Sequence, residues 1–357
     1  MTHRIALIPG DGIGLEVTPA GVRCLEALAK RPGLNFDFTE FPYSCEYYAR
    51  HGAMMPDDGI EQLRGHDAIL LGAVGYPGVP DHVSLWGLLL PIRREFQQYV
   101  NLRPVRLLRG LTSALRDRGP EDINYLVVRE NNEGEYSEIG GRLYDGLPEA
   151  MAVQATVITR KGSERILDYA FRTAQSRPRK RLAYATKSNG IKHSMPFWDE
   201  QVAAMAPQYP EIAVEQYHVD ILAANFVTHP DWFDVVVGTN LFGDILSDLG
   251  PATAGGIGVA PSANINPDPA VPSMFEPVHG SAPDIAGQNI ANPIAMIWTV
   301  VMMLEDLGEQ QAADDLMGAL ETVTGEGKVL TRDLGGRAGT TEFTDRVLAE
   351  LTDGAAG

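Results

Sequence analysis

Two aspartates four residues apart are the residues whose types and spacing most directly suggest chemistry. Asp244 and Asp248 lie in the stretch NLFGDILSD, which follows the apolar run Val235 to Val237 and ends against Gly250-Pro251. A strand turning into a short helix would place both carboxylates on one helical face, where they repel each other unless a cation lies between them. A hard divalent metal ion is one interpretation. A helix cap at Asp244 with an exposed Asp248 is the other.

A group of arginines could bind an acidic ligand. Arg93, Arg94 and Arg103 lie within LLLPIRREFQQYVNLRP, and Arg129 follows in VVRENNEGEY. Arginine binds carboxylates through two parallel hydrogen bonds, so several converging arginines would hold a small diacid. Unrelated ion pairs at the surface are the simpler interpretation of any single arginine.

Tyr136, Lys187 and His279 are candidates for proton transfer or ligand binding, although each is an ordinary residue when it is taken alone. Positive charge from arginines and a metal ion would lower the pKa of the lysine and make it a base, while the tyrosine could donate a proton. His279, in EPVHGSAPDI, looks in isolation like a loop histidine.

The elements that must position these residues alternate between strands and helices. Segments with helical periodicity separate strand-like apolar runs at Ile5 to Ile8, Ala68 to Leu71, Tyr125 to Val128, Val153 to Ile158 and Val235 to Gly238. This alternation predicts an α/β fold with a mainly parallel sheet covered by helices.

The glycines of GDGIG, Gly10 to Gly14, follow a strand and precede a helical pattern from Val17 to Leu28. Their spacing is GxGxG, whereas the dinucleotide-binding fingerprint requires GxGxxG. We therefore expect a tight strand-to-helix turn near a ligand, not a standard Rossmann site.

Composition bounds the class of protein. With 357 residues and 44% hydrophobic content, the chain can bury a large core and suggests about two domains. The formal charge of −18 argues against nucleic-acid binding and against adhesion to an anionic membrane. Two cysteines, Cys24 and Cys45, make no disulfide framework or zinc site, and the N-terminus lacks the pattern of an export signal, so we expect a cytoplasmic protein. The longest apolar run, Ile294 to Leu304, is too short to span a bilayer.

Eight ordered motifs carry a family resemblance. They are IPGDGIG, NLRP, RENNEGEY, TKSNG, NLFGDILSDLGP, GIGVAPSANI, EPVHGSAPDIAGQNIANPIA and DLGGRAGT. Together they resemble the β-decarboxylating dehydrogenases, which include isopropylmalate, isocitrate, homoisocitrate, tartrate and D-malate dehydrogenases. DHVSLWG, REFQQYVNLRPV, QSRPRK, ATKSNG and MPFWDE are similar to the tartrate and D-malate branch.

The resemblance implies an isopropylmalate dehydrogenase-like fold of two domains with a cleft between them. Residues 1–99 and 252–357 would form a discontinuous cofactor-binding domain. Residues 100–251 would form a central domain that binds substrate and metal and makes a homodimer.

The resemblance also implies roles for individual residues. Arg93, Arg103 and Arg129 would hold the carboxylates of a 2-hydroxy diacid, and Leu89 would contact its substituent. Tyr136 and Lys187 would be the catalytic pair. Asp244 and Asp248 would bind Mg²⁺ or Mn²⁺ together with Asp220. Because Lys187 and Asp220 would come from the partner subunit, each active site would be shared, and a monomer would be inactive.

The cofactor expected from the resemblance is NAD. Its site would be formed by Ile13, His279, Gly280, Ser281, Ala282, Asp284, Ile285 and Asn292. An aspartate at position 284 accepts hydrogen bonds from ribose hydroxyls and repels a 2′-phosphate, whereas members of the family that use NADP carry lysine and tyrosine at positions 284 and 285. The resemblance also implies a monovalent cation, K⁺, as a further cofactor.

The expected reaction is oxidation of a 2-hydroxy diacid followed by loss of CO₂, with D-malate or tartrate as substrate. The residues just before Arg93, which are Leu88, Leu89 and Leu90, should face the substituent that distinguishes the substrates of the family. Because leucine at position 89 is found in several branches, 3-isopropylmalate dehydrogenase stays open as an alternative. A catalytically silent regulatory subunit is a third interpretation, and the complete set of catalytic residues argues against it.

Overall fold

A computed structural model describes residues 2–353, and the chain divides into two compact units. The first unit is built from the chain up to Gln98, from Arg106–Pro120 and from Pro251 onward. The second unit comprises Tyr99–Val105 and Glu121–Gly250. The structure thus includes residues 106–120 in the first unit, whereas the sequence analysis assigned them to the central domain.

The first unit contains a sheet with strand order β2 (Asn35–Glu40), β1 (Thr2–Gly10), β3 (Ala68–Ala73), β12 (Ser273–Pro277) and β11 (Pro261–Ile265). Strands β2, β1, β3 and β12 run parallel, and β11 is antiparallel to β12. All residues of β3 are buried, as expected for a central strand with both faces covered. The helices of this unit are α1 (Gly14–Leu28), α2 (Cys45–His51), α3 (Gly59–Arg64), α4 (Asp81–Ser84), α5 (Leu90–Glu95), α10 (Ile294–Asp306), α11 (Gln310–Glu326) and α12 (Thr340–Asp353).

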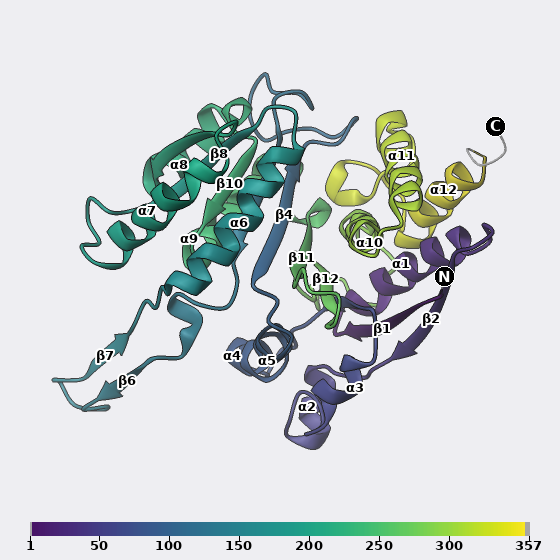
Figure 1. The fold of residues 1–357 in the computed structure, drawn as a ribbon. Coiled ribbons are helices and arrows are strands. Elements are labelled where there is room, and N and C mark those ends of the chain that lie inside the picture. Colours follow the sequence, from purple (N-terminus) through teal and green to yellow (C-terminus); the bar gives the residue numbers. More distant parts are fainter. Residues whose placement is uncertain (1, 354–357) are drawn as a thin grey trace. The chain divides into compact units, whose positions relative to one another are not determined.

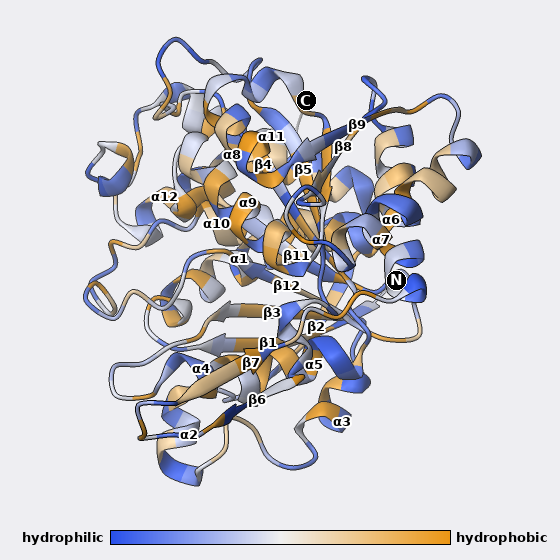
Figure 2. Ribbon diagram, turned by 90° about the vertical axis from the view of Figure 1, so that its left-hand side faces the viewer, coloured by the Kyte–Doolittle hydropathy of each residue, from blue (hydrophilic) through white to orange (hydrophobic). Residues whose placement is uncertain are grey.

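Helix α10 is the central helix of the first unit. It packs against α1, α11 and strands β11 and β12 (Figure 1). The apolar run Ile294 to Leu304 is wholly buried in it, and α10 is coloured as hydrophobic in Figure 2. Helices that are apolar all round belong in a protein core. Among residues 2–353, none of the helices has the length and apolar character needed to cross a membrane.

A second core cluster of the first unit lies around α3, α5 and the π-helical turn Leu85–Leu89. Leu88, Ile92 and Phe96 are fully buried in it, and Leu89 is half-buried against it. Leu90 is also buried. The expectation that all three leucines before Arg93 face a substrate is therefore wrong for Leu88 and Leu90, whose side chains fill the core.

The second unit contains strands in the order β4 (Val100–Arg106), β5 (Asn124–Glu130), β10 (Val235–Gly238), β8 (Arg181–Thr186) and β9 (Ala213–His218). Strand β10 is parallel to β5 and β8, and β8 is parallel to β9. Its helices are α6 (Arg160–Ser176), α7 (Ser194–Met205), α8 (Val219–Thr228) and α9 (Asn240–Thr253). Short 3₁₀ turns over the two units lie at Glu135–Ser137, Ala206–Gln208, Pro230–Trp232, Ile257–Val259 and Arg332–Leu334.

The predicted α/β class is confirmed, and four of the five predicted strands lie within β1, β3, β5 and β10. The strand predicted at Val153 to Ile158 is wrong as a strand of the main sheet. The structure has β7 (Met151–Gln154), which pairs antiparallel with β6 (Gly140–Leu143) in a separate hairpin that projects from the second unit (Figure 1). All residues of both strands are exposed, so the apolar residues there do not mark a buried strand of this chain.

Leu88→Ala is expected to destabilise the first unit by about 2–5 kcal/mol, because it leaves a cavity in a closely packed core. Leu89→Ala removes the same atoms from a half-buried position and should cost less than half as much. Urea unfolding of the two variants measures both losses. Equal losses would show that Leu88 and Leu89 contribute similarly to the core.

Candidate active site

Asp244 and Asp248 lie on α9, directly after the buried strand β10. The predicted strand-to-helix transition is therefore confirmed, although the helix continues through Pro251 to Thr253. Both carboxylates reach solvent, with side-chain exposures of 29% and 55%, whereas Leu246 and Ser247 between them are buried. Ile245, the third residue between them, is 56% exposed, so the surface of α9 carries an apolar side chain beside the two carboxylates.

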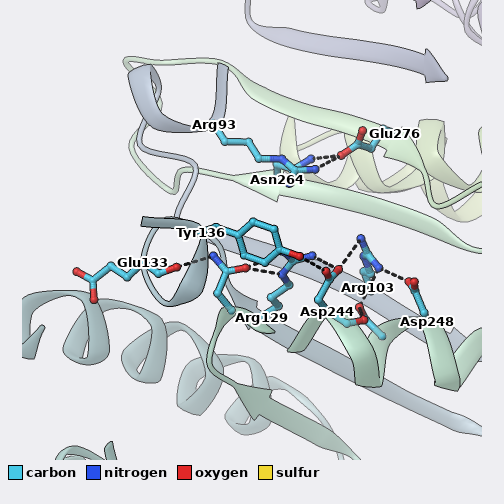
Figure 3. A network of polar contacts seen from close by, with 11 residues as sticks. Arg93, Arg103, Arg129, Glu133, Tyr136, Asp244, Asp248, Asn264 and Glu276 are labelled. Atoms are coloured by element: carbon cyan, nitrogen blue, oxygen red, sulfur yellow. Dashed lines mark hydrogen bonds and ion pairs between the residues drawn. The ribbon is translucent and has the colours of Figure 1, made fainter. Parts of the chain in front are cut away.

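Arg103, from β4, lies between the two carboxylates (Figure 3). Its Nη1 donates to Asp248 Oδ1 at 2.7 Å and to Ser247 Oγ at 2.9 Å, and its Nη2 lies 3.9 Å from Asp244 Oδ1. The guanidinium group thereby offsets the repulsion between the two carboxylates. Arg103 thus supplies a cation between the two carboxylates within this chain, whereas the divalent metal ion expected there stays a prediction.

Arg129 and Tyr136 converge on the same aspartate (Figure 3). The Nη1 of Arg129, at the end of β5, forms an ion pair with Asp244 Oδ1. The hydroxyl of Tyr136 donates to Asp244 Oδ2 at 2.9 Å, and the guanidinium carbon of Arg129 lies 5.5 Å from the centre of the tyrosine ring. The structure therefore brings together five predicted site residues, which are Arg103, Arg129, Tyr136, Asp244 and Asp248.

Arg93 belongs to the first unit, where it is buried on α5. Its Nη2 donates to Glu276 Oε1 at 2.7 Å, and Asn264 Nδ2 donates to the same oxygen at 2.8 Å. A buried arginine needs such a partner because an unpaired buried charge is costly. The convergence of Arg93 with Arg103 and Arg129 on one ligand stays a prediction.

Lys187 and Asp220 form a separate pair in the second unit. Lys187 follows β8, Asp220 lies in the first turn of α8, and Lys187 Nζ is 2.7 Å from Asp220 Oδ1. The hydrogen bond from Lys187 lowers the pKa of Asp220. In the described part of the chain, no three His, Cys, Asp or Glu side chains lie together as a metal site, so Asp220 does not join Asp244 and Asp248 within one chain. Its assignment to the partner's site stays a prediction.

The residues around Asp244 fit a divalent cation in their chemistry. Asp244 and Asp248 offer carboxylate oxygens on one face of α9, and both side chains are partly exposed. Mg²⁺ is commonly bound by one or two carboxylates and completes its shell with water and ligand oxygens. The two aspartates would supply such a pair.

Two of the predicted cofactor residues, Ile13 and Ser281, meet at the turn after β1. The backbone N–H of Ile13 donates to the carbonyl oxygen of Ser281 at 2.8 Å. Gly12 has a φ of +57°, and a Cβ there would lie 2.0 Å from that same oxygen, so only glycine fits. GDGIG is therefore a tight strand-to-helix turn, as predicted, and it packs against the segment that begins at His279.

This segment has features that fit a dinucleotide. The Nε2 atom of His279 is buried and has no hydrogen-bond partner among the described residues, and burial lowers the pKa of the ring. Asp284 is exposed and Ile285 is half-buried, so a carboxylate and an apolar side chain lie side by side at the surface. Asn292 is buried, with its Nδ2 donating to Asp333 Oδ2 at 2.8 Å. An unpartnered buried nitrogen and an exposed carboxylate are groups that a nucleotide could satisfy.

Three polar residues near these sites were not predicted. Asp11 is buried and accepts backbone N–H groups of Cys45 at 3.0 Å and Gly75 at 3.1 Å. Glu276 is the partner of Arg93, and Asn240 contacts Arg129. Asp11 lies in the glycine motif itself, but the long-range partners of all three residues leave no signal in sequence spacing.

Glu130 shapes the turn between Arg129 and Tyr136. Its buried carboxylate accepts the backbone N–H groups of Asn132 at 3.0 Å and Glu133 at 2.7 Å. Burial raises the pKa of Glu130 to about 7, and the two N–H groups oppose this shift. The group therefore titrates near neutral pH in the folded protein.

Glu130→Gln is expected to change how stability depends on pH. At pH values between the pKa of Glu130 in the unfolded chain and its higher pKa in the folded protein, the folded protein keeps a proton on Glu130 that the unfolded chain has released. Raising the pH from about 6 to about 8.5 should therefore cost the wild-type protein about 1 kcal/mol that the variant does not lose. Urea unfolding at both pH values measures the difference in the free energy of unfolding between the wild type and the variant. A difference between the two proteins that does not change with pH would contradict the shift.

Comparison with known proteins places the chain in one family. It is 58% identical to D-malate dehydrogenase [decarboxylating] of Escherichia coli (strain K12), over 97% of this chain and 98% of that protein. It is 56% identical to tartrate dehydrogenase/decarboxylase of Pseudomonas putida, over 99% and 97%. The crystal structure of isocitrate dehydrogenase from Methylococcus capsulatus matches with a TM-score of 0.87 and 35% identity, over 98% of this chain and 99% of that one. Residues 4–347 match the model of the isocitrate/isopropylmalate dehydrogenase family, so the predicted resemblance is confirmed and the chain belongs to this family.

Proposed function

We propose that this protein oxidises and decarboxylates a 2-hydroxy diacid, D-malate or tartrate, with NAD and with Mn²⁺ or Mg²⁺. The observation that carries the proposal is the convergence of Arg103, Arg129 and Tyr136 on Asp244. Two guanidinium groups beside exposed carboxylates suit a small anionic substrate that is bound together with a cation. The names of the relatives from E. coli and P. putida support the choice of D-malate or tartrate.

The arginines bind and orient the substrate in this proposal. Arg103 and Arg129 are buried, so their side chains have few other orientations and lose little freedom when they hold a carboxylate. Arg93 would hold a carboxylate from the first unit. A bound divalent cation would supply Lewis acidity at the oxygens of the substrate.

Lys187 and Tyr136 would move the protons. Lys187 of the partner subunit would accept the proton of the 2-hydroxyl group while the hydride from carbon 2 passes to NAD. The resulting ketone lies β to the second carboxylate, whose C–C bond breaks to release CO₂ and leave an enolate. Tyr136 would then donate its proton to the enolate carbon. D-malate would yield pyruvate, CO₂ and NADH.

The proposed preference for NAD rests on Asp284. Its carboxylate is exposed beside Ile285, where it can accept hydrogen bonds from ribose hydroxyls and repel a 2′-phosphate. Ile13, Gly280, Ser281 and Ala282 would line the same site. K⁺ stays a prediction that rests on the resemblance alone.

We propose a homodimer because the second unit exposes many apolar side chains. The β6–β7 hairpin and the loops next to it expose Ile139, Leu143, Tyr144, Leu147, Met151 and Val153. Ile221 and Val227 on α8 and Ile245 on α9 are exposed as well. A two-stranded hairpin is marginal alone, and large exposed apolar surfaces mark interfaces. A second copy would cover these surfaces and bring its own Lys187 and Asp220.

3-Isopropylmalate is the second candidate substrate because Leu89 is only half-buried and could meet an alkyl substituent. A regulatory subunit without activity is disfavoured, because Tyr136, Lys187 and the aspartates are all present.

The substrate is tested by kcat/KM for D-malate, the tartrate isomers, 3-isopropylmalate and isocitrate, with NAD or NADP and Mn²⁺. We expect D-malate or a tartrate to give the highest value, and NAD to be preferred over NADP by about tenfold or more, which corresponds to about 1.4 kcal/mol. A clear preference for 3-isopropylmalate would overturn the substrate, and a preference for NADP would overturn the role of Asp284.

The shared active site is tested by mixing two inactive variants, Lys187→Ala and Asp248→Asn. If lysine and aspartate come from different subunits, a mixed dimer has one intact site and one doubly substituted site. Co-expression with two different tags should then restore roughly a quarter of the wild-type activity. Each variant mixed with itself is the control. Absence of recovery in a purified mixed dimer would show that one chain supplies both residues.

A further inference from the structure

We propose that Asn240 is a positioning residue that orients Arg129 and holds the turn that carries Tyr136. The inference rests on the proposed function, and it adds a residue for which the sequence analysis assigned no role. Asn240 is the first residue of α9 and is 1% exposed.

The side chain of Asn240 joins two parts of the site. Its Oδ1 accepts hydrogen bonds from Arg129 Nε at 3.0 Å and from Arg129 Nη2 at 2.7 Å. Its Nδ2 donates to the carbonyl oxygen of Glu133 at 2.8 Å. An oxygen that accepts from both Nε and Nη2 fixes the plane of the guanidinium group. The Nη1 atom is then directed toward Asp244.

Helix capping does not explain this asparagine. An asparagine at a helix N-terminus usually accepts a backbone N–H group from the first turn of the helix. Here the N–H of Gly243 donates to the carbonyl oxygen of Thr239 at 2.7 Å, and the Asn240 oxygen accepts from Arg129. The side chain thus faces the arginine and the turn, not its own helix.

The turn from Glu130 to Gly134 depends on close packing with Asn240. Gly134 has a φ of +77°, and a Cβ added there would lie 2.9 Å from the Cβ of Asn240. Tyr136 follows two residues later, with its hydroxyl 2.9 Å from Asp244 Oδ2. Since Asn240 holds both the carbonyl of Glu133 and the guanidinium of Arg129, it sets the position of a substrate-binding group and of a proton donor together.

Asn240→Ala is expected to raise KM for D-malate about tenfold or more and to lower kcat, because Arg129 and Tyr136 both lose their support. KM for NAD should change less than about twofold, since the predicted cofactor residues lie in the other unit. Calorimetric titration with D-malate in the presence of Mn²⁺ should show weakened binding without any turnover. In an Arg129→Ala background, Asn240→Ala should raise KM little further, because the two residues act through one contact.

Asn240→Asp separates the contact with Arg129 from the contact with Glu133, and it replaces the alanine variant if that variant does not fold. Its carboxylate keeps acceptors for Arg129 and loses the donor to Glu133, so we expect KM for D-malate to lie between those of the wild type and Asn240→Ala, while kcat stays reduced. Gln201→Ala is the control, because it removes a buried side chain of α7 in the second unit, whose Nε2 donates to the carbonyl oxygen of Phe197 at 3.3 Å and which has no part in the contacts of Asn240. It should lower stability and leave both kinetic constants unchanged.

Unchanged KM and kcat in a folded Asn240→Ala enzyme would overturn the positioning role, as would equal effects on KM for NAD and for D-malate. Additive effects of Arg129→Ala and Asn240→Ala on KM would also overturn it. A wild-type protein that neither turns over nor binds D-malate or a tartrate would overturn the proposed function itself, and this inference with it.

Discussion

The pairing of buried arginines with the carboxylates of α9 is the interaction on which the site depends. Arg103 and Arg129 are almost fully buried, and an unpaired buried guanidinium would cost several kcal/mol. Asp244 and Asp248 supply the opposite charge from one helical face, and Arg103 contacts both. The arginines and the aspartates compensate each other's charge. The site therefore requires that α9, β4 and β5 keep their relative positions.

Parallel strands bring the polar residues of each unit to one edge. In the second unit, Arg129 lies at the end of β5, Lys187 follows β8, and α9 follows β10. In the first unit, the GDGIG turn follows β1, Gly75 follows β3, and His279 follows β12. Ligands of parallel sheets bind at the carboxyl ends of strands because loops with free polar groups collect there. The candidate substrate residues and the candidate cofactor residues obey this rule in their own units.

Local patterns in the sequence predicted the elements well and their long-range partners poorly. The spacing of Asp244 and Asp248 predicted a helix face, and Ile5 to Ile8 predicted a buried strand, because both features depend on neighbouring residues. The strand predicted at Val153 to Ile158 was assigned to the main sheet because its residues are apolar. The structure instead exposes every residue of β7 (Met151–Gln154). The roles of Arg103 and Tyr136 were predicted from the family resemblance, whereas no role was predicted for Asn240 or Glu276. Their partners are distant in sequence, so no spacing could indicate them.

The arginine cluster gives Asp244 two roles that simple replacement cannot separate. Its carboxylate is the partner of Arg129 and the acceptor of the Tyr136 hydroxyl, and it is also a candidate metal ligand. Removing the charge would leave Arg129 with an uncompensated buried charge, so lost activity could come from a disturbed arginine or from a lost ligand. Asp248 is more exposed and, of Arg103 and Arg129, contacts only Arg103, so its replacement leaves the contacts of Asp244 with Arg129 and Tyr136 in place. Loss of activity at Asp248 is therefore the more direct measure of a carboxylate acting on a bound ligand.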